Sequence, residues 1–410
     1  MHVVVVGGGA AGFFAAIAAA EAAPDARVTI LEKTTRLLAK VRVSGGGRCN
    51  VTHACPNPTE LVAYYPRGGR RLRGAFRLFG PAQTIEWFAR RGVALHTEAD
   101  GRMFPVSNSS ETIIECLLAA ARRAGVHIRT GAGVAALTPP KPPADSFAVA
   151  LDSGEIVRAD RVIIATGGHP KAAAYDWLTA LGHTVAAPVP SLFTFNVPDS
   201  PTAGLMGLSV AAGTARVAGE AALPPTDGPL LVTHWGFSGP AVLKQSAWGA
   251  RRLAALNYRF TALLGWASGF TEDTLRTELT RRRRDHARRA VQADPLPGIP
   301  QRLWRRLAEL AGAGPEVRWA DVPAKVQNRL VEQVLRQPVQ VSGKTTFKEE
   351  FVTCGGVVLD EVDLLTFASK RVSGLYFAGE VLDVDALTGG FNFQAAWTSG
   401  WLAGRAAVGG

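Results

Sequence analysis

Glycines near the start of the chain recur at a spacing suited to phosphate binding, in the run GGGAAG at positions 7–12. Gly7 permits a tight turn, Gly9 lets the backbone approach a pyrophosphate, and Gly12 lets a helix pack closely on a sheet. Glu32 follows about 20 residues later, where a carboxylate can accept hydrogen bonds from ribose hydroxyls. This spacing predicts a dinucleotide site, and it disfavours a ribose 2′-phosphate because that group would meet a like charge.

A second group of glycines and carboxylates lies near the other end of the chain. Gly379, Glu380 and Asp383 follow an apolar run, and residues 389–392 (GGFN) open a helical pattern. Carboxylates there can bind ribityl hydroxyls, and free N–H groups at residues 390–392 can face the pyrimidine edge of a flavin. A domain that binds only a nicotinamide dinucleotide needs no such second group of binding residues near the C-terminal end of the chain. The sequence therefore predicts FAD as the cofactor.

The first motif requires a βαβ unit to position it. Residues 2–6 form a short β-branched run typical of a strand buried on both faces, and residues 13–23 are Ala-rich and favour a helix. Residues 27–31 form a second buried run that ends at Glu32. The unit is complete in about 30 residues, the usual size.

Further elements follow the same reading. Helices are expected near 81–91, 110–124 and 391–407, and strands at 126–129, 134–137, 147–151, 156–158, 161–165 and 375–378. Residues 34–65 are expected to be a loop. Prolines, glycines and short β-like runs begin near 186, and a helical, arginine-rich stretch follows. We therefore predict an FAD-binding domain in two parts, 1–185 and 341–410, with a substrate domain inserted at 186–340.

Composition narrows the class of protein. The chain has 410 residues and a net charge of +11, which suits an anionic cofactor and leaves nucleic acid open as a partner. Four cysteines (Cys49, Cys55, Cys116, Cys354) are too few for a disulfide scaffold, and no CxxC pair suggests a metal site. No signal peptide or membrane span is indicated, so a cytoplasmic protein is expected.

Several motifs together resemble a known family. They are SGGGRCN at 44–50, THWGFSGP at 233–240, TCGGV at 353–357, GEVLD at 379–383 and GGFNFQ at 389–394. Along essentially the whole chain the sequence is similar to the HI0933-like (BaiN/aminoacetone-oxidase-like) flavoproteins. The resemblance implies an α/β fold, namely a glutathione-reductase-like, Rossmann-type FAD-binding domain with an inserted β-barrel and helical domain. Two departures are Ala386, where many members have glycine, and the segment 39–43; both leave the substrate open.

We expect the cofactor to be held by residues from both ends of the chain. Arg48 is expected to neutralise the pyrophosphate. Asn50 is expected to pair with flavin or substrate, with a bond to its own backbone as the alternative. By analogy with related flavoproteins, the backbone near Val134 is expected to contact the adenine. The full predicted set is Gly7, Gly9, Ala10, Ala11, Gly12, Glu32, Lys33, Lys40, Gly46, Arg48, Cys49, Asn50, Val134, Ala165, Thr166, Gly167, Gly379, Glu380, Asp383, Gly390, Phe391 and Asn392.

The catalytic residues are less clearly marked. His234 can protonate or bind a substrate, or simply pack, and Lys344 and Lys348 can line a pocket or be solvated. Cys354 is expected to shape the flavin pocket rather than act as a nucleophile, and Cys49 is expected to be a buried or loop cysteine. The arginines between 281 and 306 are expected to form a solvated face, with RNA contact as the alternative.

The predicted function is that of an FAD-dependent oxidoreductase. Hydride would pass between flavin N5 and a small organic substrate held between the two domains, with NAD(P)H or O₂ as the second redox partner. Both reduction of an electron-poor C=C bond and oxidation of an amine fit the sequence. The alternative is a flavoprotein that acts on or binds tRNA, although nucleic acid is the less favoured partner. Nothing in the sequence indicates an oligomeric state.

Overall fold

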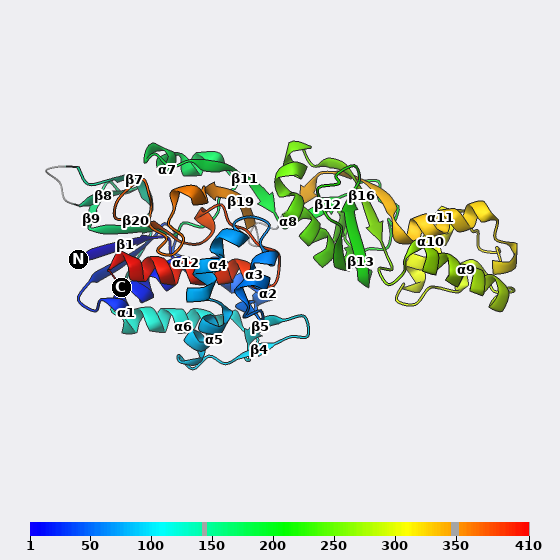
Figure 1. Cartoon of the computed structure of the whole chain (residues 1–410), viewed down its shortest axis with the longest axis horizontal. Helices are drawn as coiled ribbons and strands as arrows, with labels where there is room; N and C mark the ends of the chain where they lie inside the picture. The colour runs from blue at the N-terminus through cyan, green and yellow to red at the C-terminus, as the bar shows by residue number, and fades with distance from the viewer. Residues whose placement is uncertain (142–145, 346–351, 410) are drawn as a thin grey trace. The chain divides into compact units, whose positions relative to one another are not determined.

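A computed structural model describes residues 1–141, 146–345 and 352–409. The chain divides into two compact units (Figure 1). Unit 1 comprises Met1–Pro190 and Phe347–Gly410, and unit 2 comprises Ser191–Thr346. The sequence-based boundaries were drawn at 186 and 340. Lys348 lies outside the described residues.

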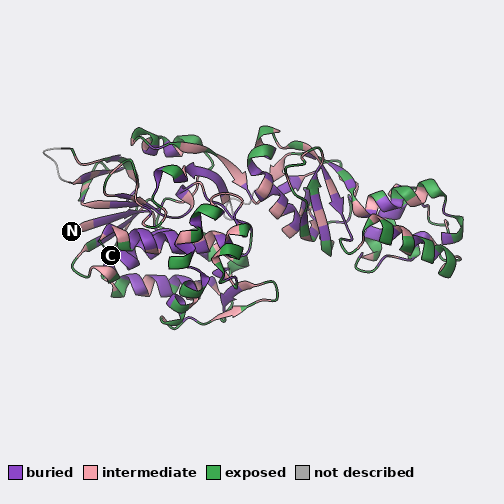
Figure 2. Cartoon of the chain, in the orientation of Figure 1, coloured by how far each residue is buried: buried purple, intermediate pink, exposed green. Residues whose placement is uncertain are grey.

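Unit 1 is built on a parallel sheet of five strands in the order β20-β10-β1-β2-β6. These strands are β1 (His2–Val6), β2 (Arg27–Glu32), β6 (His127–Thr130), β10 (Arg161–Ile164) and β20 (Leu375–Phe377). The central strands are buried on both faces, as their β-branched sequences require (Figure 2). The predicted βαβ unit is confirmed. The N-terminal strand β1 also pairs with β10, which in turn pairs with β20 near the other end of the chain.

Helices α1 (Ala10–Ala22) and α12 (Phe391–Ala407) pack against each other beside the sheet (Figure 1). A Cβ added at Gly400 would lie 2.6 Å from the Ala11 carbonyl oxygen, and one at Gly404 would lie 2.2 Å from that of Ala15. Larger side chains would therefore separate the helices. This close packing joins the two ends of the chain.

Smaller elements surround this core. Two antiparallel three-stranded sheets have the orders β3-β5-β4 and β7-β8-β9, and β11 pairs with β19. The strands are β3 (Thr52–His53), β4 (Leu95–Thr97), β5 (Arg102–Pro105), β7 (Val134–Thr138), β8 (Phe147–Leu151), β9 (Ile156–Ala159), β11 (Val185–Ser191) and β19 (Val352–Val357). The helices are α2 (Ala39–Gly47), α3 (Pro58–Leu61), α4 (Gly69–Leu78), α5 (Pro81–Ala89), α6 (Ser110–Arg123) and α7 (Asp176–Ala180).

The prediction of a loop across 34–65 was wrong. This segment contains α2, β3 and α3. Helix α2 is kinked because Ser44, Gly45 and Gly46 leave the helical region. The three consecutive glycines suggested a loop, but the five residues before Ser44 form a regular turn of helix that leads into it. Helix α4, which follows this segment, was not predicted either.

Unit 2 contains a seven-stranded antiparallel sheet of order β17-β16-β13-β14-β15-β12-β18. Its strands are β12 (Thr194–Asn196), β13 (Ser209–Val217), β14 (Thr226–Val232), β15 (Gly236–Ser238), β16 (Arg259–Gly265), β17 (Gln337–Ser342) and β18 (Lys344–Thr345). Only Gly343 separates β17 from β18, and these two strands form the opposite edges of the sheet. The segment 337–345 therefore closes the sheet on itself.

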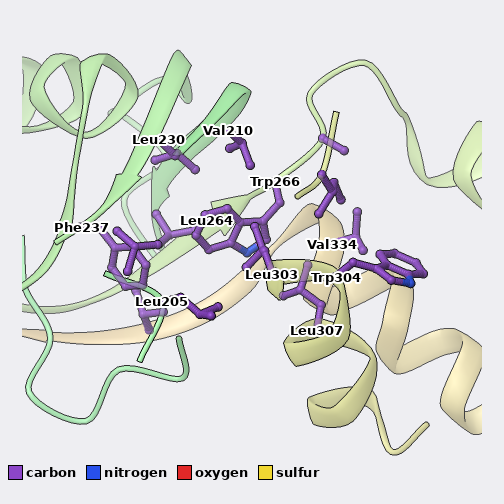
Figure 3. Packing of buried hydrophobic residues seen from close by; sticks show 14 of the residues in the cluster. Leu205, Val210, Leu230, Phe237, Leu264, Trp266, Leu303, Trp304, Leu307 and Val334 are labelled. Atoms are coloured by element: carbon purple, nitrogen blue, oxygen red, sulfur yellow. The ribbon is translucent and has the colours of Figure 1, made fainter. Parts of the chain in front are cut away.

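The described residues of unit 2 also form four α-helices: α8 (Pro240–Ala255), α9 (Glu272–Asp285), α10 (Gln301–Ala311) and α11 (Ala324–Leu335). The strands and the helical part share one hydrophobic core (Figure 3). Trp266 joins them, because its backbone N–H donates to Val334 (2.7 Å) and its indole N–H donates to the Gln337 side chain (3.0 Å). No helix among the described residues has the length and apolar character needed to cross a membrane.

Candidate functional site

The carboxyl ends of the parallel strands place the predicted site residues at one edge of the unit 1 sheet. Residues 7–12 follow β1, Glu32 ends β2, residues 165–168 follow β10, and residues 379–383 follow β20. Starting from β1, the later strands β2 and β6 are added on one side of the sheet, and β10 and β20 are added on the other side. The direction in which strands are added therefore reverses between β1 and β10. In open α/β sheets, ligands bind at the carboxyl edge beside such a reversal.

In the loop at residues 7–12, Gly7 and Gly12 pack closely against other backbone atoms, whereas Gly9 lies beside open space. A Cβ at Gly7 would lie 2.4 Å from the Ala165 carbonyl oxygen, and one at Gly12 would lie 2.0 Å from that of Gly7. Gly7 also has a φ of 111°, which disfavours other residues. At Gly9, by contrast, no atom lies within 4 Å of an added Cβ. Gly7 and Gly12 hold the turn together, and Gly9 leaves room for a ligand.

Helix α1 presents its N-terminus at this opening. Gly9 is its N-cap, no side chain caps the helix, and its first turn contains no acidic residue. Backbone N–H groups and the positive end of the helix dipole are therefore available to an anion. The loop after β10 offers similar space, because no atom lies within 4 Å of a Cβ added at Gly167. Ala165 is fixed by donation of its N–H to Val6 (2.8 Å).

Glu32 is held in place at the end of β2. Its carboxylate accepts hydrogen bonds from the Gly8 N–H and from the Thr34 N–H and hydroxyl, each at 2.8 Å. These bonds orient the carboxylate beside the glycine loop. Lys33, next to it, is exposed and its Cβ lies 3.3 Å from a Cβ added at Gly133, the residue before Val134. The sites expected for ribose and for adenine thus adjoin.

Glu380 links the segment that follows β20 to the rest of the site. One of its oxygens accepts from the Thr353 N–H (2.8 Å), and the other forms an ion pair with Lys40 of α2 (2.7 Å). A Cβ at Gly168 would lie 2.4 Å from the Thr353 hydroxyl oxygen and 2.7 Å from Glu380. The Thr353 hydroxyl is buried without a hydrogen-bond partner among the described residues. Three separate segments, at Lys40, Gly168 and Thr353, therefore converge on the Glu380 carboxylate.

Residues 378–390, which join β20 to α12 and are called the return loop below, lead into the N-terminus of α12. Its N-cap, Gly390, sits so close to β3 that an added Cβ would lie 2.5 Å from the Thr52 carbonyl oxygen. Phe391 stacks on Tyr64 (4.2 Å between ring centroids) and on His53 (4.6 Å). The Asn392 amide bonds both the N–H and the carbonyl of Ala386. Asn392 therefore fixes the loop through its side chain.

Sequence reasoning missed a buried ion pair in this loop. Asp385 is fully buried and binds Arg67 through both carboxylate oxygens, with the Arg67 Nε at 2.5 Å from one of them. The neighbouring Leu387 N–H donates to Tyr64, and the Tyr65 hydroxyl donates to Phe391. Residues 64–67 thus brace the loop that delivers α12. The acidic pair Glu380 and Asp383 signalled the loop, but nothing in the sequence marked Arg67.

The SGGGRCN segment is anchored to β5 and to the turn between β4 and β5. The Arg48 guanidinium lies over the Phe104 ring (4.0 Å) and binds Glu98 (2.7 Å), so in this structure it pairs with a carboxylate. Cys49 is fully buried, and burial raises the pKa of its thiol to about 12. Such a thiol is a poor nucleophile at neutral pH. Asn50 is also buried, whereas Gly46 has open space beside it.

The three catalytic candidates occupy different surroundings. Cys354 is fully buried in β19 of unit 1. Lys344 and His234 belong to unit 2. The Lys344 ammonium lies 5.0 Å from the centre of the Tyr258 ring, and burial lowers its pKa. His234 is exposed in the turn between β14 and β15.

The arginine-rich region is only partly a solvated face. Arg282 is buried, where it binds Glu278, Asp294 and the Asp294 carbonyl. Arg281 and Arg284 are exposed and pair with acidic residues of α9. The expectation of a solvated face fails at Arg282, because its guanidinium is held among these carboxylates in the helical part of unit 2.

The arrangement of unit 1 fits FAD. The uncapped N-terminus of α1 and the space at Gly9 and Gly167 suit a pyrophosphate. Carboxylates at the ends of β2 and just after β20 suit ribose and ribityl hydroxyls. The N-terminus of α12, which also lacks a side-chain cap, suits the edge of the flavin where negative charge develops.

Comparison with known proteins supports this reading. The family model for the HI0933-like protein Rossmann domain matches residues 1–406. A 3-dehydro-bile acid delta(4,6)-reductase of Clostridium scindens is 32% identical over 401 residues, which cover 95% of each chain. A ribosomal RNA dihydrouridine synthase of Escherichia coli is 30% identical over 393 residues, which cover 92% of this chain and 90% of the relative.

A solved structure shows the same fold at greater distance. The 3-ketosteroid-delta4-(5alpha)-dehydrogenase of Rhodococcus jostii has a TM-score of 0.51 at 16% identity, covering 99% of this chain and 95% of that one. The family match extends across both units and both ends of the nucleotide-binding edge. The chain therefore belongs to the HI0933-like Rossmann-domain family and is an FAD-dependent oxidoreductase.

Proposed function

We propose that this protein is a reductase that uses FAD and NAD(P)H to saturate a C=C bond conjugated to a carbonyl group. The observation that carries the proposal is the relationship to two proteins whose names describe this reaction. One reduces the delta(4,6) bonds of a 3-oxo bile acid, and the other converts uridine in RNA to dihydrouridine. In both substrates the reduced double bond is conjugated to a carbonyl.

The overall reaction balances without a further reactant. Bound FAD would supply the hydride chemistry that couples oxidation of NAD(P)H to reduction of the acceptor at its β-carbon. The α-carbon then takes a proton from a donor group or from water, so that one NAD(P)H and one proton are consumed per double bond. The chain has no second GxGxxG motif. We infer that NAD(P)H binds transiently instead of occupying a dinucleotide domain of its own.

The residues of unit 1 would divide the work of holding the cofactor. The α1 N-terminus and Gly9 would take the pyrophosphate, and Glu32 would accept bonds from the ribose hydroxyls. Glu380 and Asp383 would bind the ribityl chain. The N–H groups of Gly390 to Asn392 would stabilise negative charge on the pyrimidine edge. The Lys40–Glu380 ion pair supports this assignment, because it orients one of these carboxylates.

Anaerobic half-reactions test the proposal. The purified enzyme is first reduced with NADH or NADPH, and the loss of visible flavin absorbance is recorded. Reduced enzyme is then mixed with 4-androstene-3,17-dione or with uridine 5′-monophosphate, and a separate sample of oxidised enzyme is mixed with an amine as control. Return of the oxidised spectrum with an enone, and a product two mass units heavier, would support the proposal. Reduction of the flavin by the amine, with no reaction of either unsaturated compound, would overturn it.

A second candidate function is the reduction of uridine within structured RNA. The relatives named as ribosomal RNA dihydrouridine synthases, at 30% and 26% identity, favour it, and so does the net charge of +11. Its test is dihydrouridine content in ribosomal and transfer RNA after incubation with enzyme and NADPH. Formation of dihydrouridine in RNA, without turnover of free enones, would select this candidate over a small-molecule reductase.

A further inference from the structure

Helix α4 of unit 1 lies in a segment that is rich in arginine and lacks acidic residues. Residues 61–85 contain five arginines and no aspartate, glutamate or lysine. Two of the five pair with carboxylates elsewhere in unit 1, Arg67 with Asp385 and Arg71 with Asp360. The other three are exposed, and they form no ion pair or hydrogen bond within the part of the chain that the structure describes. They are Arg70, Arg73 and Arg77.

These three arginines lie along one face of α4. Their spacing of i, i+3 and i+7 forms a single stripe about 10 Å long, because an α-helix rises about 1.5 Å per residue. The opposite face of the helix is buried, at Leu72, Ala75 and Phe76. The free face of α4 is therefore basic, and we call its three arginines the α4 stripe.

The helix that carries the stripe is fixed beside the predicted flavin site. At its N-cap, Gly68, an added Cβ would lie 2.8 Å from the Val384 side chain and 3.4 Å from the Asp383 carbonyl oxygen, both in the return loop. At its other end, Phe79 stacks on Trp401 of α12, with 4.9 Å between ring centroids. Helix α4 thus packs on α12 (Figure 1). The stripe and the return loop belong to one compact unit.

The arginines of α9 in unit 2 differ from this stripe. That helix has five arginines and four acidic residues among its 14 residues. Arg276, Arg281 and Arg284 form ion pairs with carboxylates of α9 itself. Their positive charge is therefore largely balanced within the helix, whereas the charge of the α4 stripe is left for a partner.

The chemistry of the stripe suits a chain of phosphates. Arginine can donate two hydrogen bonds at once to a phosphate, and a stripe about 10 Å long exceeds a single phosphate group. A membrane surface fits less well, because an amphipathic helix binds lipid through its apolar face, and that face of α4 is buried. A nucleic acid backbone presents its phosphates in a row at its outer surface, which matches a basic face without apolar insertion.

We propose that the α4 stripe binds the phosphate backbone of structured RNA. This inference rests on the second candidate function, and it names the surface that would hold the RNA during reduction of a uridine. Contacts with phosphates position a nucleic acid but do not read its sequence. The stripe would therefore supply affinity and orientation, and the flavin site would supply the reaction.

The experiment measures RNA binding by the holoenzyme separately from its chemistry. The Kd values for transfer RNA and ribosomal RNA transcribed in vitro are measured between about 50 and 200 mM salt. Flavin reduction by NADPH, dihydrouridine formation and binding to phosphatidylserine vesicles are measured alongside. Alanine favours helix, so substitutions on the exposed face should not unfold α4. The triple variants are Arg70→Ala/Arg73→Ala/Arg77→Ala, Arg70→Lys/Arg73→Lys/Arg77→Lys and, as a control that removes equal charge from α9, Arg276→Ala/Arg281→Ala/Arg284→Ala.

Loss of the stripe should change the salt dependence of RNA binding. Each phosphate contact adds about 0.7 to 0.9 to the slope of log Kd against log salt concentration, so the alanine variant of the stripe should lower that slope by about 2 to 3. At about 0.1 M salt its RNA binding should be about 100-fold weaker. The lysine variant, which keeps the charge, and the α9 control should retain most of the wild-type slope. All variants should reduce flavin with NADPH as wild type does.

The outcomes distinguish this inference from the function on which it rests. Dihydrouridine formation by wild type, with an unchanged salt slope in the alanine variant of the stripe, would overturn the stripe's role and leave the second candidate function intact. RNA binding that depends on the stripe, without dihydrouridine formation, would overturn that function and leave the stripe's role intact. Stripe-dependent binding to the vesicles without binding to RNA, or slower reduction by NADPH with RNA binding unchanged, would also overturn the inference.

Discussion

At Gly9 the chain leaves room for a ligand, whereas at Gly7 and Gly12 it packs against itself. This difference allows a sharp test at the scale of one residue. Gly9→Trp should fold but purify without colour, because the indole would fill the space meant for the pyrophosphate. Gly314→Trp is the matched control, since its added Cβ is equally open and it lies in unit 2. A yellow Gly9→Trp protein would contradict the site.

Glu32 provides a second test at this scale. Removing its carboxylate in Glu32→Ala should weaken FAD binding by about 1 to 3 kcal/mol, the range for a lost hydrogen bond to a charged group. Titration of the apoprotein with FAD, followed by flavin fluorescence, measures the change. Glu155→Ala, which removes an exposed carboxylate paired with Arg129, should bind FAD as wild type does. Equal affinity in the two variants would remove Glu32 from the site.

The sequence identified these residues because their spacing is local. Gly7, Gly9, Gly12 and Glu32 fall within one βαβ unit, where the chemistry and the fold share the same pattern. The partners Lys40 and Glu380 are 340 residues apart, and Arg67 and Asp385 are 318 apart. Such pairs depend on how distant segments fold together. No spacing rule in a single sequence could reveal them.

At the scale of elements, the return loop and α12 depend on the Arg67–Asp385 pair. Arg67→Met would leave a buried carboxylate without its partner, which should cost about 3 to 5 kcal/mol. We expect faster FAD dissociation and a lower midpoint of unfolding in urea, with partial recovery in Arg67→Lys. Arg71→Met is the control, because the Arg71–Asp360 pair is exposed. Similar behaviour of Arg67→Met and Arg71→Met would contradict the bracing role.

A second element, the start of β11, is tied down by Glu361. Burial alone would raise the pKa of this carboxyl, but hydrogen bonds from Thr184, Arg371 and His183 lower it from 4.5 to about 2. Because the folded-state pKa is depressed, the carboxylate stabilises the fold above pH 4.5. That contribution is lost as the pH falls towards 2. Burial likewise lowers the pKa of His183 and favours its neutral form.

Glu361→Gln should therefore destabilise the protein in a pH-dependent manner. The loss should be about 1 to 3 kcal/mol at pH 7, where a charged hydrogen-bond acceptor is removed, and smaller at pH 3. Urea unfolding at both pH values measures it. Glu155→Gln, at an exposed ion pair, controls for charge. A loss that is the same at pH 3 and pH 7 would show that the carboxylate's ionisation does not stabilise this region.

Most elements of unit 1 could be predicted from periodicity, and the final helix coincides with its predicted range of 391–407. The error in segment 34–65 has a local cause, because a glycine-rich kink concealed the helical residues before it. A β-barrel in the inserted domain was expected only from the family resemblance, and closure of the unit 2 sheet through residues 337–345 was not predicted. Alternation along one strand cannot show which two neighbours it pairs with.

At the scale of the whole molecule, the chain separates cofactor binding from a second unit with its own core. The positive charge of +11 has two uses in this account, namely attraction of an anionic dinucleotide and, in the second candidate function, of RNA. Salt dependence of substrate KM would separate them. A small enone should show little dependence, whereas RNA should bind much more weakly as salt is raised.

The central claim is that the carboxyl edge of the unit 1 sheet holds FAD for reduction of a conjugated double bond. The most direct test is the visible spectrum of the purified protein, followed by anaerobic addition of NADPH and then of 4-androstene-3,17-dione. We expect equimolar FAD, bleaching by NADPH, and return of the oxidised spectrum with the enone as the saturated ketone forms. A colourless protein that cannot take up FAD would show that this edge is not a flavin site.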